Sequence, residues 1–302
     1  MPASESILPA KSTITNDLPI TTIKPSSGWA ALNLREIWDY RDLLVTLATR
    51  DLKIRYKQTV LGVLWVILQQ FVSVLIFAVI FGVFAQLPSD GLPHAVFINT
   101  GFLCWNLFNG VTSRVANSML GNSNLISKVY FPRLLIPLAG VMSVLIDFVI
   151  TAGVTAVFLF AFKIPLTLNI LALPFFMLLT ILIATGIGLV LATLNVQYRD
   201  FVYAMPFMLQ VLFYASPIIF PSSMITDKLS TLFAENALAS WFGFLFTLNP
   251  VVGLVEGFRW SLLGKSSLTP AMVISDIIFA IALFAIGTAV FRRFERRFVD
   301  VI

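Results

Sequence analysis

The sequence predicts an all-α integral membrane protein with six transmembrane helices, and three observations support this fold class. Apolar residues make up 58% of the 302 residues, and the mean hydropathy is +0.92. Charged residues make up only 12%, whereas soluble domains carry about 25%. Apolar runs recur at lengths near the roughly 20 residues with which a helix crosses a bilayer. Most of the protein surface is therefore expected to face lipid.

The composition excludes several classes of function. One Cys and one His supply neither a disulfide framework nor a multi-Cys zinc site, so we expect no metal centre and no redox chemistry. The net charge of +5 could suggest nucleic acid, but in a lipid-embedded chain basic residues mark the cytoplasmic face. We expect no nucleic-acid partner.

The N-terminal region predicts two different structures. Residues 1–28 are rich in Ser, Thr and Pro and resemble a disordered tail, without the apolar core of a cleavable signal peptide. From residue 33 onward, apolar residues recur at helical spacing, and a basic cluster (Arg50, Lys53, Arg55, Lys57) precedes the first long apolar run. This pattern indicates an amphipathic helix in the membrane interface near anionic lipid, with a soluble surface helix as the alternative.

Six spans are predicted, at about residues 59–85, 95–113, 134–162, 170–194, 201–220 and 273–291. The second span contains Asn99, Asn106 and Asn109, so it should face other helices or a water-filled path. The third span holds Asp147 near its middle. A structural hydrogen bond to a neighbouring helix is favoured over a proton relay, because no second intramembrane acid or base accompanies this carboxylate.

Residues 237–263 fit neither a loop nor a span. An apolar piece of 12 residues is followed by Asn249-Pro250 and then by a second apolar piece that contains Glu256 and Arg259. Apolar pieces of this length are more often re-entrant than spanning. We expect a re-entrant hairpin, with a seventh span as the alternative.

The distribution of basic residues predicts the orientation. With both termini in the cytoplasm, sixteen of the twenty basic residues lie on the cytoplasmic side, in the tail and first helix, the 114–133 loop, the 195–200 loop and the C-terminus. The four others are Lys163, Lys228, Arg259 and Lys265. Positive charge is retained in the cytoplasm, so this asymmetry favours cytoplasmic termini and an even number of spans.

A nucleotide-binding loop is not predicted. Gly264-Lys265-Ser266 resembles the end of a Walker A motif, but Arg259 stands where that motif needs its first Gly. The triplet is expected to be a turn. Any ATP-driven activity would therefore need an ATPase on another chain.

Polar residues point to two kinds of candidate site. The 114–133 loop contains a short helix-like polar piece that suits docking into a partner's cleft, although an ordinary loop would look similar. Arg199 and Asp200 place opposite charges at the end of a span, as an interfacial anchor does. The amides of the first two spans lie among aromatic residues and could line a carbohydrate path or join helices to one another. They are Gln69, Gln70, Asn99, Asn106 and Asn109.

Four segments together resemble the permease subunit of type-2 ABC exporters of polysaccharide, a group that includes O-antigen, capsule and teichoic-acid permeases. They are RDLKIRYKQTVLGVLW (50–65), NSNLISKVYFPR (122–133), YRDF (198–201) and LNPVVGLVEGFR (248–259). The resemblance covers about residues 30–300.

The resemblance implies an interface helix, six spans and re-entrant gate helices between spans five and six. It also implies a homodimer in the bacterial inner membrane, paired with two copies of a separate ATPase subunit that binds ATP and Mg²⁺, while this chain carries no cofactor. A lipid-linked polysaccharide would pass between the two copies, bordered by the first and fifth spans.

The resemblance also assigns residues to these roles. The ATPase-contact residues would be Asn117, Ser118, Asn122, Ser123, Asn124, Leu125, Ile126, Lys128, Arg199 and Asp200. The substrate path or gate would include the amides named above together with Trp65, Phe213, Tyr214, Trp241, Phe242 and Phe244.

Two alternative functions stay open. One is a type-2 ABC exporter of a small hydrophobic compound, whose path would be more uniformly apolar. The other is a membrane-embedded glycosyl or lipid transferase, which would need clustered acidic or His residues at one membrane face.

Overall fold

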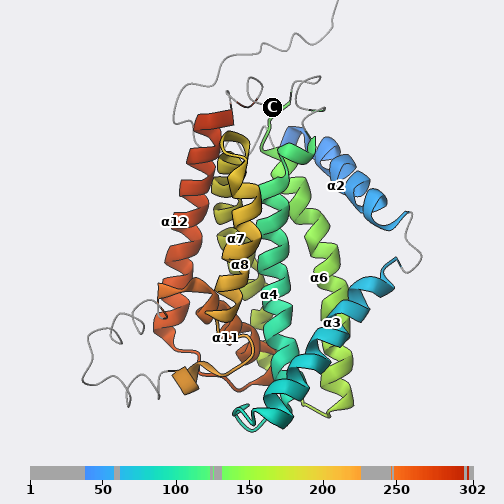
Figure 1. The fold of residues 1–302 in the computed structure, drawn as a ribbon, viewed down its shortest axis with the longest axis vertical. Helices are drawn as coiled ribbons and strands as arrows, with labels where there is room; N and C mark the ends of the chain where they lie inside the picture. The colour runs from blue at the N-terminus through green and yellow to red at the C-terminus, as the bar shows by residue number, and fades with distance from the viewer. Residues whose placement is uncertain are drawn as a thin grey trace, which may run out of the picture.

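The computed structural model describes residues 38–57, 62–122, 125, 131–225, 246, 248–295 and 298, and every regular element in these ranges is a helix (Figure 1). The long helices are α2 (Arg41–Tyr56), α3 (Leu64–Phe77), α4 (His94–Asn117), α6 (Leu135–Ala161), α7 (Leu173–Gln197), α8 (Asp200–Tyr214), α11 (Pro250–Leu263) and α12 (Pro270–Phe294). Short segments are the π-helix η1 (Ala78–Phe84), which continues α3, and the 3₁₀ turns η2 (Leu120–Asn122) and η3 (Leu168–Ala172).

The bundle has two distinct ends. Helices α4, α7 and α12 all end at the top of Figure 1, and we call this the C-terminal end because α12 is the last of the described long helices. Helix α11 lies near the opposite end, against α4, α7 and α12. Helix α2 leaves the C-terminal end obliquely beside α6, and α3 crosses α4 and α6 lower down.

In the described part of the chain, four helical stretches are long and apolar enough to cross a membrane. They are Leu64–Phe84, Leu135–Ala161, Leu168–Gln197 and Pro270–Phe294. They match the first, third, fourth and sixth predicted spans. The first is the most exposed of them, with only 11% of its apolar window buried, so it presents a large apolar surface outside the chain's own core.

The second predicted span is the central helix of the bundle. Helix α4 packs against α3, α6, α7, α8 and α11, and most of its residues are buried, Asn99 completely. The sequence predicted that this polar span faces other helices or a water-filled path. Most of the helix faces other helices, and Asn106 and Asn109 line a cavity. Its polar residues make it less apolar than every other long helix except α2.

The fifth predicted span is shorter than expected. Helix α8 ends at Tyr214, whereas the sequence analysis carried the span to residue 220. Pro217 follows Ser216, and the residue before a proline is disfavoured in the helical conformation, so the chain turns here. Pro206 lies inside α8 and removes one backbone donor from it.

Helix α11 is the second half of the predicted re-entrant hairpin. The side chain of Asn249 caps its N-terminus by accepting a hydrogen bond from the Val251 amide, at 3.0 Å, and Pro250 occupies the first position. Gly264 ends it with a φ of 68°, a left-handed conformation that favours glycine. This is the turn expected for Gly264-Lys265-Ser266. Residues 237–245 of the predicted hairpin lie outside the described residues.

Candidate functional site

At the C-terminal end, the two loops expected to contact a partner begin beside each other. Asn195, in the last turn of α7, is completely buried and its Nδ2 donates to the carbonyl oxygen of Ala116, at 2.9 Å, and to Oδ1 of Asn117, at 3.5 Å. This amide joins the end of α7 to the end of α4. Asn195 is not among the site residues predicted from the sequence, although an amide at the end of an apolar run is the kind of signal that could have indicated it.

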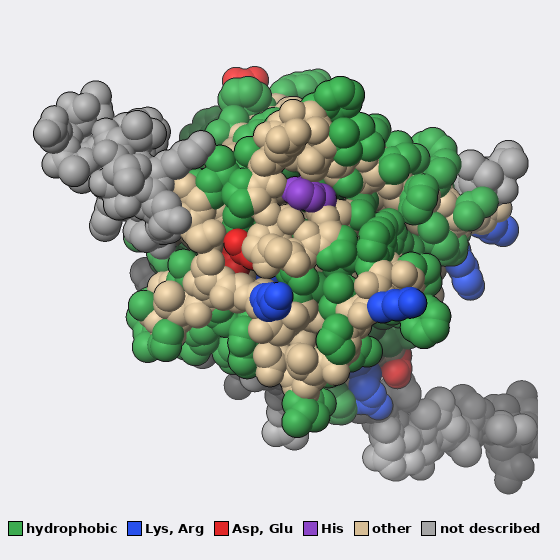
Figure 2. All heavy atoms as spheres, turned by 90° about the horizontal axis from the view of Figure 1, so that it is seen from below, with side chains coloured by type: hydrophobic (Ala, Val, Ile, Leu, Met, Phe, Trp, Pro, Cys, Tyr) green, Lys and Arg blue, Asp and Glu red, His purple; other side chains and the backbone are tan. Residues whose placement is uncertain are grey.

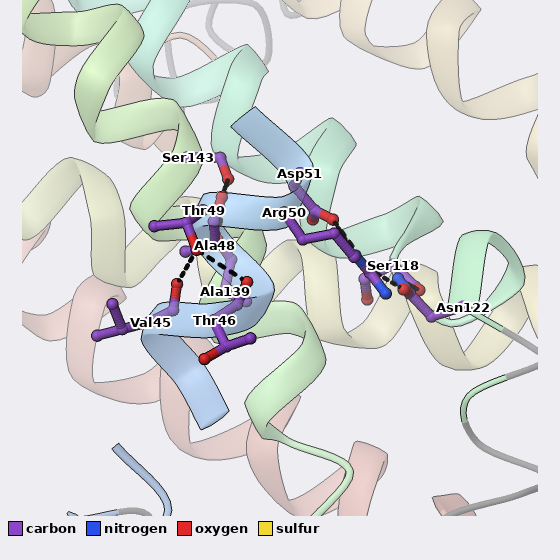
Figure 3. A network of polar contacts seen from close by, with 10 residues as sticks. All are labelled: Val45, Thr46, Ala48, Thr49, Arg50, Asp51, Ser118, Asn122, Ala139 and Ser143. Carbon is purple, nitrogen blue, oxygen red and sulfur yellow. Dashed lines mark hydrogen bonds and ion pairs between the residues drawn. The ribbon is translucent and has the colours of Figure 1, made fainter. Parts of the chain in front are cut away.

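Helix α2 is bonded to the same loop through Arg50 (Figure 3). The guanidinium donates to Oδ1 of Asp51, at 2.8 Å, and to Oδ1 of Asn122 in η2. Asn122 in turn donates to the carbonyl oxygen of Ser118, at 2.9 Å. Arg50, which the sequence analysis placed near anionic lipid, therefore also fixes the position of the 117–122 turn.

The C-terminal part of α2 is fixed to the middle of α6. Arg55 forms an ion pair with Asp147, and the hydroxyl of Tyr56 donates to Oδ1 of Asp147, at 2.5 Å. Partial burial and this hydrogen bond raise the pKa of Tyr56 to about 12. The expectation that Asp147 pairs with a neighbouring helix is confirmed, and that helix is α2, the predicted interface helix, rather than another predicted span.

Two adjoining cavities open between α2, α3, α4 and α6. The first, about 560 Å³, lies among α3, α4 and α6 and is lined by Trp65, Gln69, Asn109 and Phe148, among others. The second, about 890 Å³, lies toward the C-terminal end between α2, α4 and α6. Arg55, Gly110, Val144 and Asp147 line both, so the ion pair of Arg55 and Asp147 stands where the cavities meet.

The structure divides the amide group of the first two spans into two sets. Gln70 donates to Asn99, at 2.7 Å, and accepts from Asn106, at 2.5 Å, so these three form a hydrogen-bonded chain between α3 and α4. Gln69 and Asn109 line the first cavity beside the indole of Trp65. The first set joins the two helices, and its members Gln70 and Asn106 also line the first cavity, whereas Asn99 does not. Gln69 and Asn109 are available to contact a molecule in the cavity.

The two aromatic candidates at the end of α8 differ in exposure. Phe213 is buried in an aromatic cluster with Phe77, Phe102 and Trp105, with ring centroids 5.4–6.0 Å apart. Tyr214 is exposed on the outer surface of α8. Phe213 therefore packs α8 against α3 and α4, and only Tyr214 can contact a molecule outside the chain.

The opposite end holds a buried ion pair. Arg259 of α11 donates to Oε1 of Glu256, at 3.0 Å, and to the carbonyl oxygen of Ile218, at 2.9 Å, and its guanidinium lies 3.7 Å from the ring centre of Phe97. Oε2 of Glu256 accepts from the Ser267 amide, at 3.1 Å. Seen from this end, charged side chains are sparse among apolar and backbone atoms (Figure 2).

The predicted contact residues for a partner subunit lie at the C-terminal end where they are described. Asn117 is exposed, Ser118 is buried and Leu125 is partly buried against the core. Arg199 and Asp200, at the start of α8, are exposed. The remaining candidates, Ser123, Asn124, Ile126 and Lys128, and the gate candidates Trp241, Phe242 and Phe244, lie outside the described residues.

Long apolar helices packed around a more polar central helix define a multi-pass membrane protein. Residues 42–263 match the family described as ABC-2 type transporter, and the chain belongs to this family. It is a non-enzymatic permease subunit, since members of this membrane family lack an ATPase.

The chain is similar to curated permeases of one kind. It is 28% identical over 264 residues to the O-antigen export system permease protein RfbA of Klebsiella pneumoniae, covering 86% of this chain and 95% of the relative. It is also 28% identical over 226 residues to the protein of the same name from Myxococcus xanthus, covering 75% of this chain and 82% of the relative.

Proposed function

We propose that this chain is the permease subunit of an ATP-driven exporter that moves a lipid-linked polysaccharide across the bacterial inner membrane. The observation that carries the proposal is the similarity to O-antigen export permeases, which extends over 86% of this chain and 95% of theirs. A likeness over 264 residues is too long to reflect one shared pair of helices.

The proposed topology has six spans with both termini in the cytoplasm. The six spans are the four long apolar stretches together with helices α4 and α8. The excess of basic residues at the C-terminal end supports a cytoplasmic location for that end. In this topology α11 belongs to a re-entrant hairpin at the outer face. Two copies of the chain would enclose the path, bordered by the exposed faces of α3 and α8.

The proposed ATPase contact is formed by the 117–128 segment and the Arg199-Asp200 step. The hydrogen bonds of Asn195 support this assignment, because they hold the beginnings of both loops together. ATP and Mg²⁺ would bind to the partner subunit, present in two copies. Movement of that partner would reach α2 through Arg50 and Asn122, and α6 through Arg55 and Asp147.

The proposed cargo suits the cavity chemistry. Trp65, Gln69 and Asn109 combine an aromatic face with amide donors and acceptors along one cavity. Amides satisfy sugar hydroxyls, and an aromatic face packs on the apolar side of a sugar ring. Gln70 and Asn106 line the same cavity and also form the hydrogen bonds that join α3 to α4, in which Asn99 takes part as well.

Co-purification tests the proposal. The tagged chain is isolated from its native membrane in mild detergent, and subunit composition, ATPase activity and surface polysaccharide are measured. Leu125→Asp and Asn124→Lys should lose the ATPase subunit or its coupling to export. Leu168→Asp, at an exposed leucine in η3 at the opposite end, is the control. A chain that comes alone while well folded, or normal export by both loop variants, would refute the proposal.

A further inference from the structure

The second cavity concentrates arginines. Arg50 and Arg55 of α2 and Arg114 in the last turn of α4 all line it, together with Asp51 and Asp147. Three guanidinium groups thus face two carboxylates, which leaves the cavity with an excess positive charge. Guanidinium groups present paired donors that match the oxygens of a phosphate.

Arg114 supplies the uncompensated charge. Arg50 pairs with Asp51, and Arg55 pairs with Asp147, whereas Arg114 forms no ion pair among the residues that the structure describes. Its Cβ lies against Gly140 of α6, so the side chain starts from the wall between α4 and α6. An anion in the cavity would therefore meet one free guanidinium and two that already hold a carboxylate.

The cavity is roomy because small residues line it. Gly110, Ser113, Gly121 and Gly140 contribute little side-chain volume, and the volume of about 890 Å³ falls within the range of small-ligand sites. The arginines that could hold an anion come from α2 and α4, and α6 forms the third wall of the recess with Ile136, Gly140, Val144 and Asp147. This is a recess between helices, not an exposed basic surface.

The recess continues into an apolar surface. Beyond Arg55 and Asp147 it joins the first cavity, where Leu68 and Val72 of α3 are 41% and 40% exposed. Leu64, Phe71 and Leu75 extend this exposed apolar face along α3. In a membrane, such a face contacts hydrocarbon chains. A ligand that reached from the arginines to α3 would need a charged head and a hydrocarbon tail.

We infer that the cavity between α2, α4 and α6 binds the phosphate headgroup of a lipid whose hydrocarbon chain lies along α3. Arg114 is the free phosphate contact, and Arg50 and Arg55 complete the recess. When the site is empty, the Asp147 carboxylate pairs with the Arg55 guanidinium. A phosphate that binds in the cavity competes with Asp147 for that guanidinium. The inference deepens the proposed function, because a lipid-linked cargo would present its headgroup at this end of the permease.

Binding of defined lipids to the full-length chain in detergent, measured by native mass spectrometry, tests the inference. The probes are dioleoyl phosphatidic acid, dioleoylglycerol with the same tails and no phosphate, and sodium phosphate without a tail. We expect phosphatidic acid to bind at least tenfold more tightly than the other two. Equal binding of the two lipids would indicate only the lipid shell around the helices, and equal binding of sodium phosphate would indicate a free-anion site. Either result would overturn the inference.

Variants separate this site from a general basic surface. Arg114→Gln should weaken phosphatidic acid binding about tenfold, the usual effect of losing one charge-assisted hydrogen bond. Arg293→Gln is the matched control, since Arg293 is an exposed arginine in the last turn of α12 at the same end. Equal losses in both variants would contradict the inference.

The Asp147→Asn variant should strengthen phosphatidic acid binding, the opposite of the effect expected for Arg114→Gln. It removes the competing carboxylate while keeping a side chain of the same shape for Tyr56, so phosphatidic acid should bind several-fold more tightly. If the ion pair is purely structural, Asp147→Asn will not raise the affinity for phosphatidic acid, and this result would contradict competition at Arg55. These measurements need neither the ATPase subunit nor export, so the lipid site and the proposed function can fail separately.

Discussion

Arg259 is a fully buried arginine whose three contacts join separate parts of the opposite end. Its guanidinium contacts Glu256 on its own helix, the carbonyl oxygen of Ile218 after α8, and the ring of Phe97 on α4. A charge removed from water is stable only while its partners are present. Arg259 therefore holds α11 in place, and the stability of the protein should be highly sensitive to its substitution.

We expect Arg259→Met to lower the free energy of unfolding by about 3–5 kcal/mol, because it leaves the Glu256 carboxylate buried without its partner. The double variant Glu256→Met/Arg259→Met should cost clearly less than the sum of the two single variants. Denaturation of the purified protein in detergent measures all four free energies. Additive effects would show that the two charges do not depend on each other.

The hydroxyl of Tyr56 predicts a pH dependence. Its pKa in the folded protein is raised to about 12, above the ordinary value of about 10, because burial and the bond to Asp147 favour the neutral form. A raised pKa contributes stability fully below pH 10, and this contribution is lost as the pH rises through 12.

Thermal unfolding at pH 8, 10 and 11 tests this dependence against Tyr56→Phe. The difference in unfolding temperature between the native protein and the variant should be largest at pH 8 and shrink at pH 11. Tyr203→Phe is the control, since Tyr203 is exposed on α8 and lies away from this junction. A difference that grows with pH would contradict the expected sign.

Residue chemistry explains what the sequence could and could not predict about the candidate site. A carboxylate in the middle of an apolar span requires a partner, so the pairing of Asp147 followed from the sequence alone. The identity of that partner did not, because Arg55 is 92 positions away and only the packing of α2 on α6 brings them together. For the same reason, no local pattern could show that Gln70, rather than its neighbour Gln69, bonds to Asn99.

At the scale of elements, the contact between α7 and α12 depends on two glycines. A Cβ at Gly186 would lie 2.4 Å from the backbone of Leu283, and a Cβ at Gly287 would lie 2.2 Å from the carbonyl oxygen of Gly186. The two backbones therefore touch, as small residues permit between membrane helices.

We expect Gly287→Ala to destabilise the protein by about 1–3 kcal/mol, since the added methyl group must push backbone apart. Gly153→Ala is the matched control, because a Cβ at that position of α6 would meet no atom within 4 Å. There the better helix propensity of Ala should raise stability slightly. Unfolding of both variants in detergent decides the point, and similar effects at the two positions would refute the packing argument.

Helix positions followed from apolar runs more reliably than helix ends did. The third and sixth predicted spans correspond closely to α6 and α12, because uninterrupted apolar sequence leaves no other way to satisfy the backbone in lipid. Helix α8 ends just before the Ser216-Pro217 step. The apolar run continues beyond this local signal, so hydropathy predicted too late an end for the helix. The oblique path of α2 against α6 depends on the long-range contacts of Ala48, Arg55 and Tyr56, which no run of residues encodes.

At the scale of the whole molecule, large apolar faces stay exposed among the residues that the structure describes. Phe71 and Leu75 on α3, and Phe207 and Tyr214 on α8, are each about half exposed or more. Both helices are joined to α4 through the cluster of Phe77, Phe102 and Phe213. In the proposed dimer these faces border the path, whereas the exposed face of α6 contacts lipid only.

Cysteine cross-linking in native membranes distinguishes the two kinds of face. The only cysteine, Cys104, is buried and should react slowly, so an introduced thiol dominates the signal. We expect Phe207→Cys on α8 to give a covalent dimer under mild oxidation or with a short bifunctional reagent. Phe160→Cys on α6, which is 86% exposed, should not, because lipid separates it from a second copy. Dimers from both positions would indicate random collision, and dimers from Phe160→Cys alone would place the interface on α6 and remove α8 from the border of the path.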